Sequence, residues 1–184
     1  VSATNTAGNE AIGEALRFAN EPSSSGYDAL NVRAQIGYTL NSYVRVKGLV
    51  SLDLFSTGGT HFHVGETLRA SAVDRPLSQS LLEQAAQATT PSLWRGMGAN
   101  INDESRFAQV TSVVRSIRHF SARSGTTDTV GVLVINLSDE IMQEYLRRVP
   151  LPQGQMLMLI DAAGRVALHS DGQMVGQLLS PALM

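Results

Sequence analysis

The 184 residues carry 14 Lys and Arg side chains against 16 Asp and Glu side chains, for a net charge of -2. That balance offers a nucleic acid no concentrated positive face, while a hydrophobic fraction of 43% fits a globular domain with a substantial core. The chain has no cysteine, which excludes disulfides, thiolate catalysis and cysteine-bound zinc.

The first part of the chain predicts two helices followed by a strand. Apolar residues recur at helical spacing to about residue 20, residues 22–26 interrupt the pattern, and a second helix is expected over residues 27–43. The period then changes to two, because apolar and polar residues alternate from Val44 and Val46 through Leu54. This alternation predicts a half-buried strand that starts near residue 44.

A strand–turn–strand pattern occurs twice. The first copy is a strand ending in Asp53, a turn through Gly58 and Gly59, and a return strand over residues 60–65. The second copy is a strand ending in Asp161, a turn through Gly164, and a return strand over residues 165–169. The repetition predicts two related sheet modules in tandem. We expect both aspartates to accept backbone N–H bonds in their turns.

The remaining elements complete the first module. A short helix is predicted over residues 77–88, and a loop over residues 91–98 carries the only tryptophan. Residues 106–120 and 130–137 predict an antiparallel pair of strands, the second of which is apolar enough to be central and covered on both faces. A helix over residues 138–149 and a linker then predict a boundary near residue 150.

Three stretches, taken in this order, resemble a known family. They are residues 43–65 with their Leu-Asp-turn-Gly-Gly hairpin, the run from Trp94 through residues 115–117 to 131–137, and the helix over 138–149 followed by residues 159–166. The set is similar to the tandem Cache domain, a PAS-like sensor module found outside the cytoplasm in bacterial histidine kinases, diguanylate cyclases and chemoreceptors.

The resemblance implies a fold and a division of the chain. The fold would be α+β, a PAS-like antiparallel sheet with flanking helices and a long N-terminal helical region. Residues 1–43 would form that helical region, residues 44–150 the membrane-distal module, and residues 151–184 the incomplete start of a membrane-proximal module. No apolar run reaches the roughly 20 residues that cross a bilayer. No signal peptide opens the chain either, so we expect Val1 to mark a fragment boundary.

The resemblance also implies a function. The chain would be the extracytoplasmic sensing region of a membrane-anchored receptor, would bind a small molecule, with a carboxylate as one candidate, and would signal to a cytoplasmic kinase or cyclase domain. The full-length receptor would be a homodimer and would meet the membrane only through flanking segments. We expect no enzymatic activity in this region, no cofactor and no nucleic-acid partner.

Trp94 and Arg95 are the first candidate ligand-binding residues. In the family, segments over one face of the distal sheet form the pocket, and an aromatic wall beside a guanidinium suits a small carboxylate. The alternative is that Trp94 only fills the core beneath its loop. Amino-acid-binding members place an arginine two residues before the tryptophan and an aromatic residue directly after it. Here Ser92 and Arg95 occupy those positions, which argues against amino-acid recognition.

Arg115, Arg118 and His119 are the other candidates for ligand binding. Alternation along the strand places Arg115 and His119 on one face and Arg118 on the other. Whichever arginine points inward needs an anion, because a lone buried charge is too costly. The alternatives are a solvated sheet face or an ion pair with Asp103 or Glu104.

His61 and His63 lie on the same side of a predicted strand, a spacing compatible with metal binding, and Glu66 is close enough to be a third ligand. Hairpin histidines are commonly exposed to solvent, however. We therefore expect these two to be exposed and to hold no metal.

Other classes of function stay open on weaker grounds. An intracellular PAS-type module that binds a cofactor or dimerises a regulator is the main alternative, since histidines are able to ligate haem iron. A hydrolase or transferase would need a catalytic set, but the chain has no Gly-x-Ser-x-Gly elbow, phosphate loop or His-Glu-x-x-His motif. A structural role is the remaining possibility.

Overall fold

The computed structural model describes residues 2–20, 26–122, 124–160, 164–169 and 171–179. The elements are α1 (Ser2–Ala19), α2 (Gly26–Asn41), β1 (Leu49–Ser56), β2 (His61–Gly65), η1 (Ala70–Ala72), α3 (Arg75–Gln87), β3 (Ser92–Ala99), β4 (Gln109–Ser121), β5 (Thr126–Leu137), α4 (Asp139–Arg147), β6 (Met158–Ile160), β7 (Val166–His169) and η2 (Gly172–Met174). Within these residues, no helix is both long enough and apolar enough to span a bilayer.

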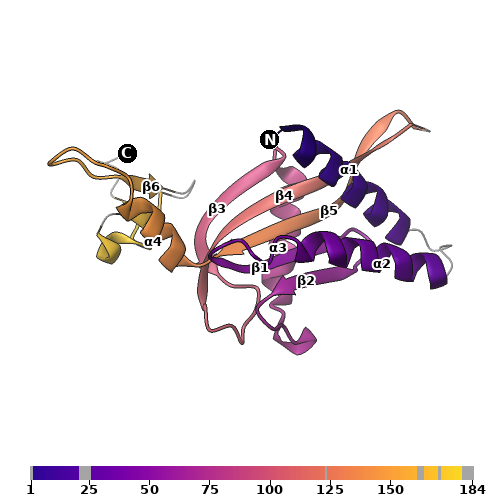
Figure 1. Ribbon diagram of the computed structural model, residues 1–184, viewed down its shortest axis with the longest axis horizontal. Helices are drawn as coiled ribbons and strands as arrows, with labels where there is room; N and C mark the ends of the chain where they lie inside the picture. The colour runs from indigo at the N-terminus through magenta and orange to yellow at the C-terminus, as the bar shows by residue number, and fades with distance from the viewer. Residues whose placement is uncertain (1, 21–25, 123, 161–163, 170, 180–184) are drawn as a thin grey trace.

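Five strands form one antiparallel sheet in the order β2-β1-β5-β4-β3, and β6 and β7 form a separate two-stranded sheet. Helices α1 and α2 pack on one face of the large sheet, and α3 packs on the other (Figure 1). Helix α4 and strand β6 lie beyond one end of this sheet, at the left of the view. Both faces of the large sheet are therefore covered by helices, and each face has its own hydrophobic core.

Strand β5 is central and contributes to both cores. Leu133 and Ile135 pack against the α1–α2 core, whereas Val132 and Val134 belong to the α3 core. Because alternate side chains point to opposite faces and both faces are covered, neither set is free to be polar without a partner. This confirms the prediction that the apolar run after residue 130 is a central strand.

The segment predicted as the start of the first strand is instead a series of turns. In these turns the Val44 amide donates a hydrogen bond to the Asn41 carbonyl oxygen, and the Val46 amide donates one to the Tyr43 carbonyl oxygen. Strand β1 begins only at Leu49, directly after Gly48, whose φ of 81° lies in the region that favours glycine. Val44 and Val46 are 44% and 50% exposed, so their alternation did not report burial in a sheet.

The predicted loop around Trp94 is also wrong, because residues 92–99 form β3, an edge strand paired with β4. The ladder register shifts between Trp94 and Gly96, and Gly96 has a φ of 75°. Glycine inside a strand commonly marks a bulge of this kind. The glycine-rich sequence that suggested a loop therefore belongs to an edge strand with a bulge.

Gly131 provides a test of how tightly α1 packs on the sheet. A Cβ at this position would lie 2.7 Å from both the Leu16 Cδ1 atom and the Phe55 carbonyl oxygen. We expect Gly131→Ala to lower the free energy of unfolding by about 1–3 kcal/mol, measured by urea denaturation, because the backbone oxygen cannot move away freely. Gly37→Ala, at an open position inside α2, is the matched control and should stabilise by roughly 0.5–1 kcal/mol. Equal effects at the two glycines would contradict the packing described here.

Candidate ligand-binding site

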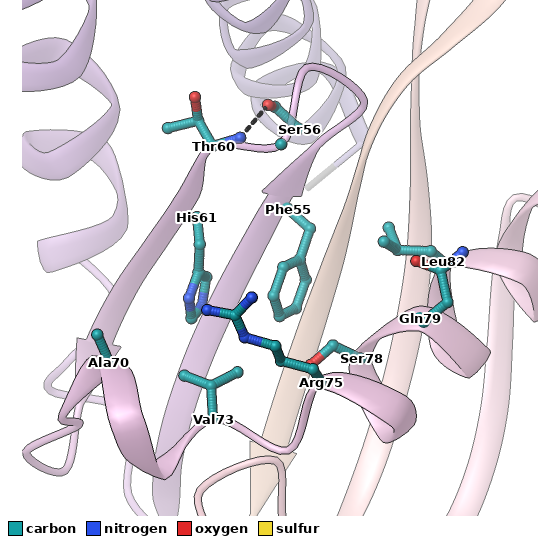
Figure 2. Close-up of a pocket in the computed structure, with 11 residues that line it drawn as sticks. Phe55, Ser56, Thr60, His61, Ala70, Val73, Arg75, Ser78, Gln79 and Leu82 are labelled. Carbon is teal, nitrogen blue, oxygen red and sulfur yellow. Dashed lines mark hydrogen bonds between the residues drawn. The ribbon is translucent and has the colours of Figure 1, made fainter.

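A cavity of about 430 Å³ lies on the α3 face of the sheet, at the end formed by β1 and β2. Strands β1 and β2 and their turn supply one wall, and η1 with the first two turns of α3 supplies the other (Figure 2). The lining residues are Phe55, Ser56, Gly59, Thr60, His61, Ala70, Val73, Arg75, Ser78, Gln79 and Leu82. No carboxylate is among them, so the side chains that line this space favour a neutral or anionic ligand.

Arg75 is the one full cation of the lining. It is the first residue of α3, directly after the N-cap residue Asp74, whose side chain accepts a hydrogen bond from the Leu77 amide at 2.8 Å. Figure 2 shows the guanidinium reaching across the cavity toward His61 and Phe55. Across the part of the chain that the structure describes, the Arg75 side chain has neither an ion pair nor a hydrogen bond. A planar guanidinium left in this position suits a carboxylate, which it binds through two parallel hydrogen bonds.

Behind the cavity wall, a buried carboxylate organises the polar part of the sheet. Asp53 is 1% exposed and lies opposite His63 in the β1–β2 ladder. Its Oδ1 atom lies 2.9 Å from His61 Nε2 and 2.7 Å from His63 Nδ1. Its Oδ2 atom accepts a hydrogen bond from Ser51 Oγ at 2.7 Å. The charge of Asp53 is therefore fully paired inside the protein, as a buried carboxylate requires.

His63 is placed so that both ring nitrogens face acceptors. Its Nδ1 atom meets Asp53, and its Nε2 atom lies 2.6 Å from the Glu66 carbonyl oxygen. Burial opposes the charged imidazolium, but the hydrogen bond to Asp53, the charge of Asp53 and the Glu66 carbonyl outweigh it and raise the pKa of His63. Burial likewise opposes the ionised form of Asp53, yet the hydrogen bonds from the two histidines lower its pKa.

These contacts overturn three expectations. Asp53 lies within β1 and not in the turn, and its partners are side chains and not turn amides. The side chains of His61 and His63 are only 23% and 18% exposed, so the histidines are not a solvated pair. Glu66 meets His63 through its backbone, while its carboxylate contacts Ser105 and Arg106. Asp161, the counterpart of Asp53 in the second unit, lies outside the described residues.

Comparison with known proteins finds likeness in structure but not in sequence. No family model matches the chain, and no curated protein sequence matches it. The ligand-binding domain of the Pseudomonas fluorescens chemoreceptor CtaA, in complex with L-leucine, is 14% identical with a TM-score of 0.57, over 97% of this chain and 68% of that one. The periplasmic sensory domain of the Campylobacter jejuni chemoreceptor Tlp1 is 14% identical with a TM-score of 0.56, over 95% and 67%.

A third structure extends the same group. The ligand-binding domain of the Pseudomonas aeruginosa amino-acid chemoreceptor PctC, in complex with GABA, is 16% identical with a TM-score of 0.56, over 97% of this chain and 71% of that one. The fold is that of chemoreceptor ligand-binding domains. This confirms the predicted α+β, PAS-like sheet with flanking helices, and the chain spans about two thirds of the length of these domains.

None of the five residues predicted to bind ligand lines the cavity. Trp94 and Arg115 lie opposite Val113 and Leu133 in the ladders, on the face that α1 and α2 cover. Arg95 sits in the β3 bulge, where burial lowers the pKa of its guanidinium. Arg118 is exposed, and His119 is half-buried near the β4–β5 turn. The structure thus does not bring these residues together, and their role in binding stays a prediction.

Sequence reasoning missed Arg75, Phe55 and Asn136 at this site. Arg75 carries a local signal, because the Asp-Arg-Pro sequence is typical of a helix start and places this arginine in the first turn of the helix. Asn136 could have been noticed as the one amide in the apolar run over residues 130–137 of β5. Such a residue in a doubly covered strand needs a buried partner.

Asn136 supports the carboxylate network from the neighbouring strand. Its side chain is fully buried, its Oδ1 atom accepts from Ser112 Oγ at 2.7 Å, and its Nδ2 atom donates to Ser51 Oγ at 2.9 Å. We expect Asn136→Ala to lower the free energy of unfolding by about 2–4 kcal/mol, because two buried hydroxyl groups lose a partner and a void forms.

The measurement is chemical denaturation in the presence of EDTA, with Asn31→Ala on the exposed surface of α2 as the control. The control should change stability by no more than about 0.5 kcal/mol. A loss at Asn136 as small as that at Asn31 would show that the network contributes little.

Proposed function

We propose that this chain is the extracytoplasmic ligand-sensing domain of a membrane-anchored bacterial signalling receptor. The cavity on the α3 face, with the unpartnered Arg75 guanidinium reaching across it, is the observation that carries the proposal. The likeness in fold to chemoreceptor domains supports it. The output domain would be a kinase, a cyclase or a chemotaxis signalling domain elsewhere in the receptor.

The ligand of this cavity is proposed to be a small carboxylate without an ammonium group. Arg75 supplies a partner for the carboxylate, and Phe55, Val73 and Leu82 supply apolar surface for a short carbon skeleton. The lining contains no acid to pair with an ammonium group. The bound L-leucine and GABA of CtaA and PctC belong to those proteins, and the absence of the Arg-x-Trp-aromatic pattern around Trp94 argues against the same specificity here.

Signal output would pass from the sheet into the segment after β5. Residues 44–150 would be the membrane-distal module and residues 151–184 would belong to a membrane-proximal one, in a receptor that works as a homodimer. The separate β6–β7 sheet supports this division. Lys47, next to Gly48, pairs with Glu144 of α4 at 2.8 Å, which joins the start of the distal module to its last helix. A ligand would act by favouring one of two arrangements of these parts, which requires different affinities for the two.

The proposal is tested by adding pyruvate, lactate, succinate, L-valine, L-leucine and GABA to the purified chain. We expect at least one of the three carboxylates without an amine to raise the melting temperature, because a ligand that binds the folded state stabilises it. Isothermal titration then gives its Kd. Arg75→Gln should weaken binding about 10- to 100-fold, the effect of losing a charge-assisted hydrogen-bond pair.

Arg33→Gln, an exposed arginine of α2 outside the cavity, is the matched control and should leave the Kd unchanged. If the amino acids bind and the simple carboxylates do not, the proposed ligand class is wrong. If a ligand binds equally well to the Arg75 and Arg33 variants, the cavity described here is not the sensing site.

A further inference from the structure

Three metal-ligating atoms converge beside the cavity. Asp53 Oδ1, His61 Nε2 and His63 Nδ1 all lie within 4.8 Å of one another, and each histidine nitrogen is within 2.9 Å of the carboxylate oxygen. The β-ladder produces this arrangement, because His63 is directly opposite Asp53 and His61 is two residues away on the same face. The cluster is thus held by the regular geometry of the hairpin.

A supporting shell fixes two of these three ligands. The second oxygen of Asp53 accepts a hydrogen bond from Ser51, which in turn is held by Asn136. The second nitrogen of His63 is hydrogen-bonded to the Glu66 carbonyl oxygen. Protein metal sites are built in this way: the ligating histidine donates its other N–H to a carbonyl or carboxylate, and the ligating carboxylate is itself hydrogen-bonded.

We propose that Asp53, His61 and His63 bind a transition-metal dication of the zinc type. Two imidazole nitrogens and one carboxylate oxygen suit zinc and its neighbours, whereas magnesium and calcium prefer oxygen ligands alone. Three protein ligands leave a coordination position open, as in zinc sites that bind an exchangeable ligand. His61 also lines the cavity, so the open position is reached from there.

The metal needs only a small opening of the cluster. Ligand atoms about 2.0–2.2 Å from a tetrahedral ion are roughly 3.3–3.5 Å apart, against 2.7 and 2.9 Å between the nitrogens and the oxygen here. Both rings belong to β2, which is an edge strand, and both are partly exposed. The rings therefore have room to separate by about half an ångström, and the ion replaces the two protons that otherwise lie between these atoms.

The test is a titration of the metal alone. After removal of metal with EDTA and exchange into chelator-free buffer, the purified chain is titrated with zinc chloride by calorimetry and by competition with a chromophoric chelator. We expect one zinc ion per chain and a higher melting temperature with zinc, and no binding of magnesium under the same conditions.

Variants locate the site. His61→Ala and His63→Ala should each weaken zinc binding at least about 100-fold, a larger loss than removing a residue that only hydrogen-bonds to a ligand produces. His119→Ala removes a histidine of β4 outside the cluster and should bind zinc like the unmodified chain. Circular dichroism melting of the metal-free variants shows that each is folded.

No zinc binding by the unmodified chain, or unchanged binding in both the His61 and His63 variants, would overturn the proposal and leave the cluster as a hydrogen-bonded ion pair. This outcome is separate from the proposed sensory function, because the titration contains no organic ligand. Carboxylate binding that survives without any zinc binding would remove the metal site alone.

Discussion

A polar side chain buried in a sheet that is covered on both faces is costly unless it has a partner inside the protein, and among the described residues of this sheet only Trp94 Nε1 and Thr111 Oγ1 are buried polar side-chain atoms without one. Water cannot reach such a group, and each unsatisfied one costs free energy comparable to a lost hydrogen bond. On the α3 face of this sheet, Asp53, Ser51, Ser112 and Asn136 are all buried. They are tolerated because they form one connected network across β1, β5 and β4, with the two histidines of β2 closing it at the sheet edge.

The same constraint explains where the cavity lies. Helix α3 covers the middle of this face, where Leu81 and Ala85 meet Val114, Val132 and Val134 in an apolar core. Over β1 and β2 the cover is the shorter η1 segment and the start of α3. The part of the polar network formed by Asp53, His61 and His63 lies at this thinner end, and His61 also lines the cavity. The site proposed for a charged small molecule therefore lies where the fold already has to accommodate polar groups.

The sequence was sufficient for elements whose pattern is local. The apolar run of β5, the helical spacing of α1 and the glycine turn between β1 and β2 each follow from short-range preferences, and the structure agrees with them. The prediction that the first strand starts near residue 44 failed because Val44 and Val46, two exposed valines in turns, have the same spacing as two buried valines in a strand. The prediction of a loop around Trp94 failed because the glycine after it lies in a β-bulge. A bulge depends on pairing with β4 and not on the segment itself.

The candidate site was harder to predict because it depends on strand register. Nothing local says that Asp53 faces His63, since a shift of one residue in the β1–β2 pairing would turn His61 and His63 to the α1–α2 side, while the pairing of β1 with β5 keeps Asp53 on the α3 face. The side chain of Glu66 was an equally reasonable partner by sequence distance, yet the chain after β2 carries it toward Ser105. The place of Arg75 in the site depends on α3 beginning beside β2, ten residues after the end of that strand.

His61 joins the two proposed binding events. Its ring stacks on Phe55 with centroids 4.3 Å apart at the cavity wall, and its Nε2 atom points to Asp53. A metal ion held there would add positive charge on the side of the cavity that faces Arg75, so a carboxylate would bind more tightly when the metal is present. By linkage, the carboxylate would then tighten metal binding by the same factor. In that arrangement one strand, β2, would contact both ligands through His61. Its pairing with β1 would transmit their combined effect to the rest of the sheet.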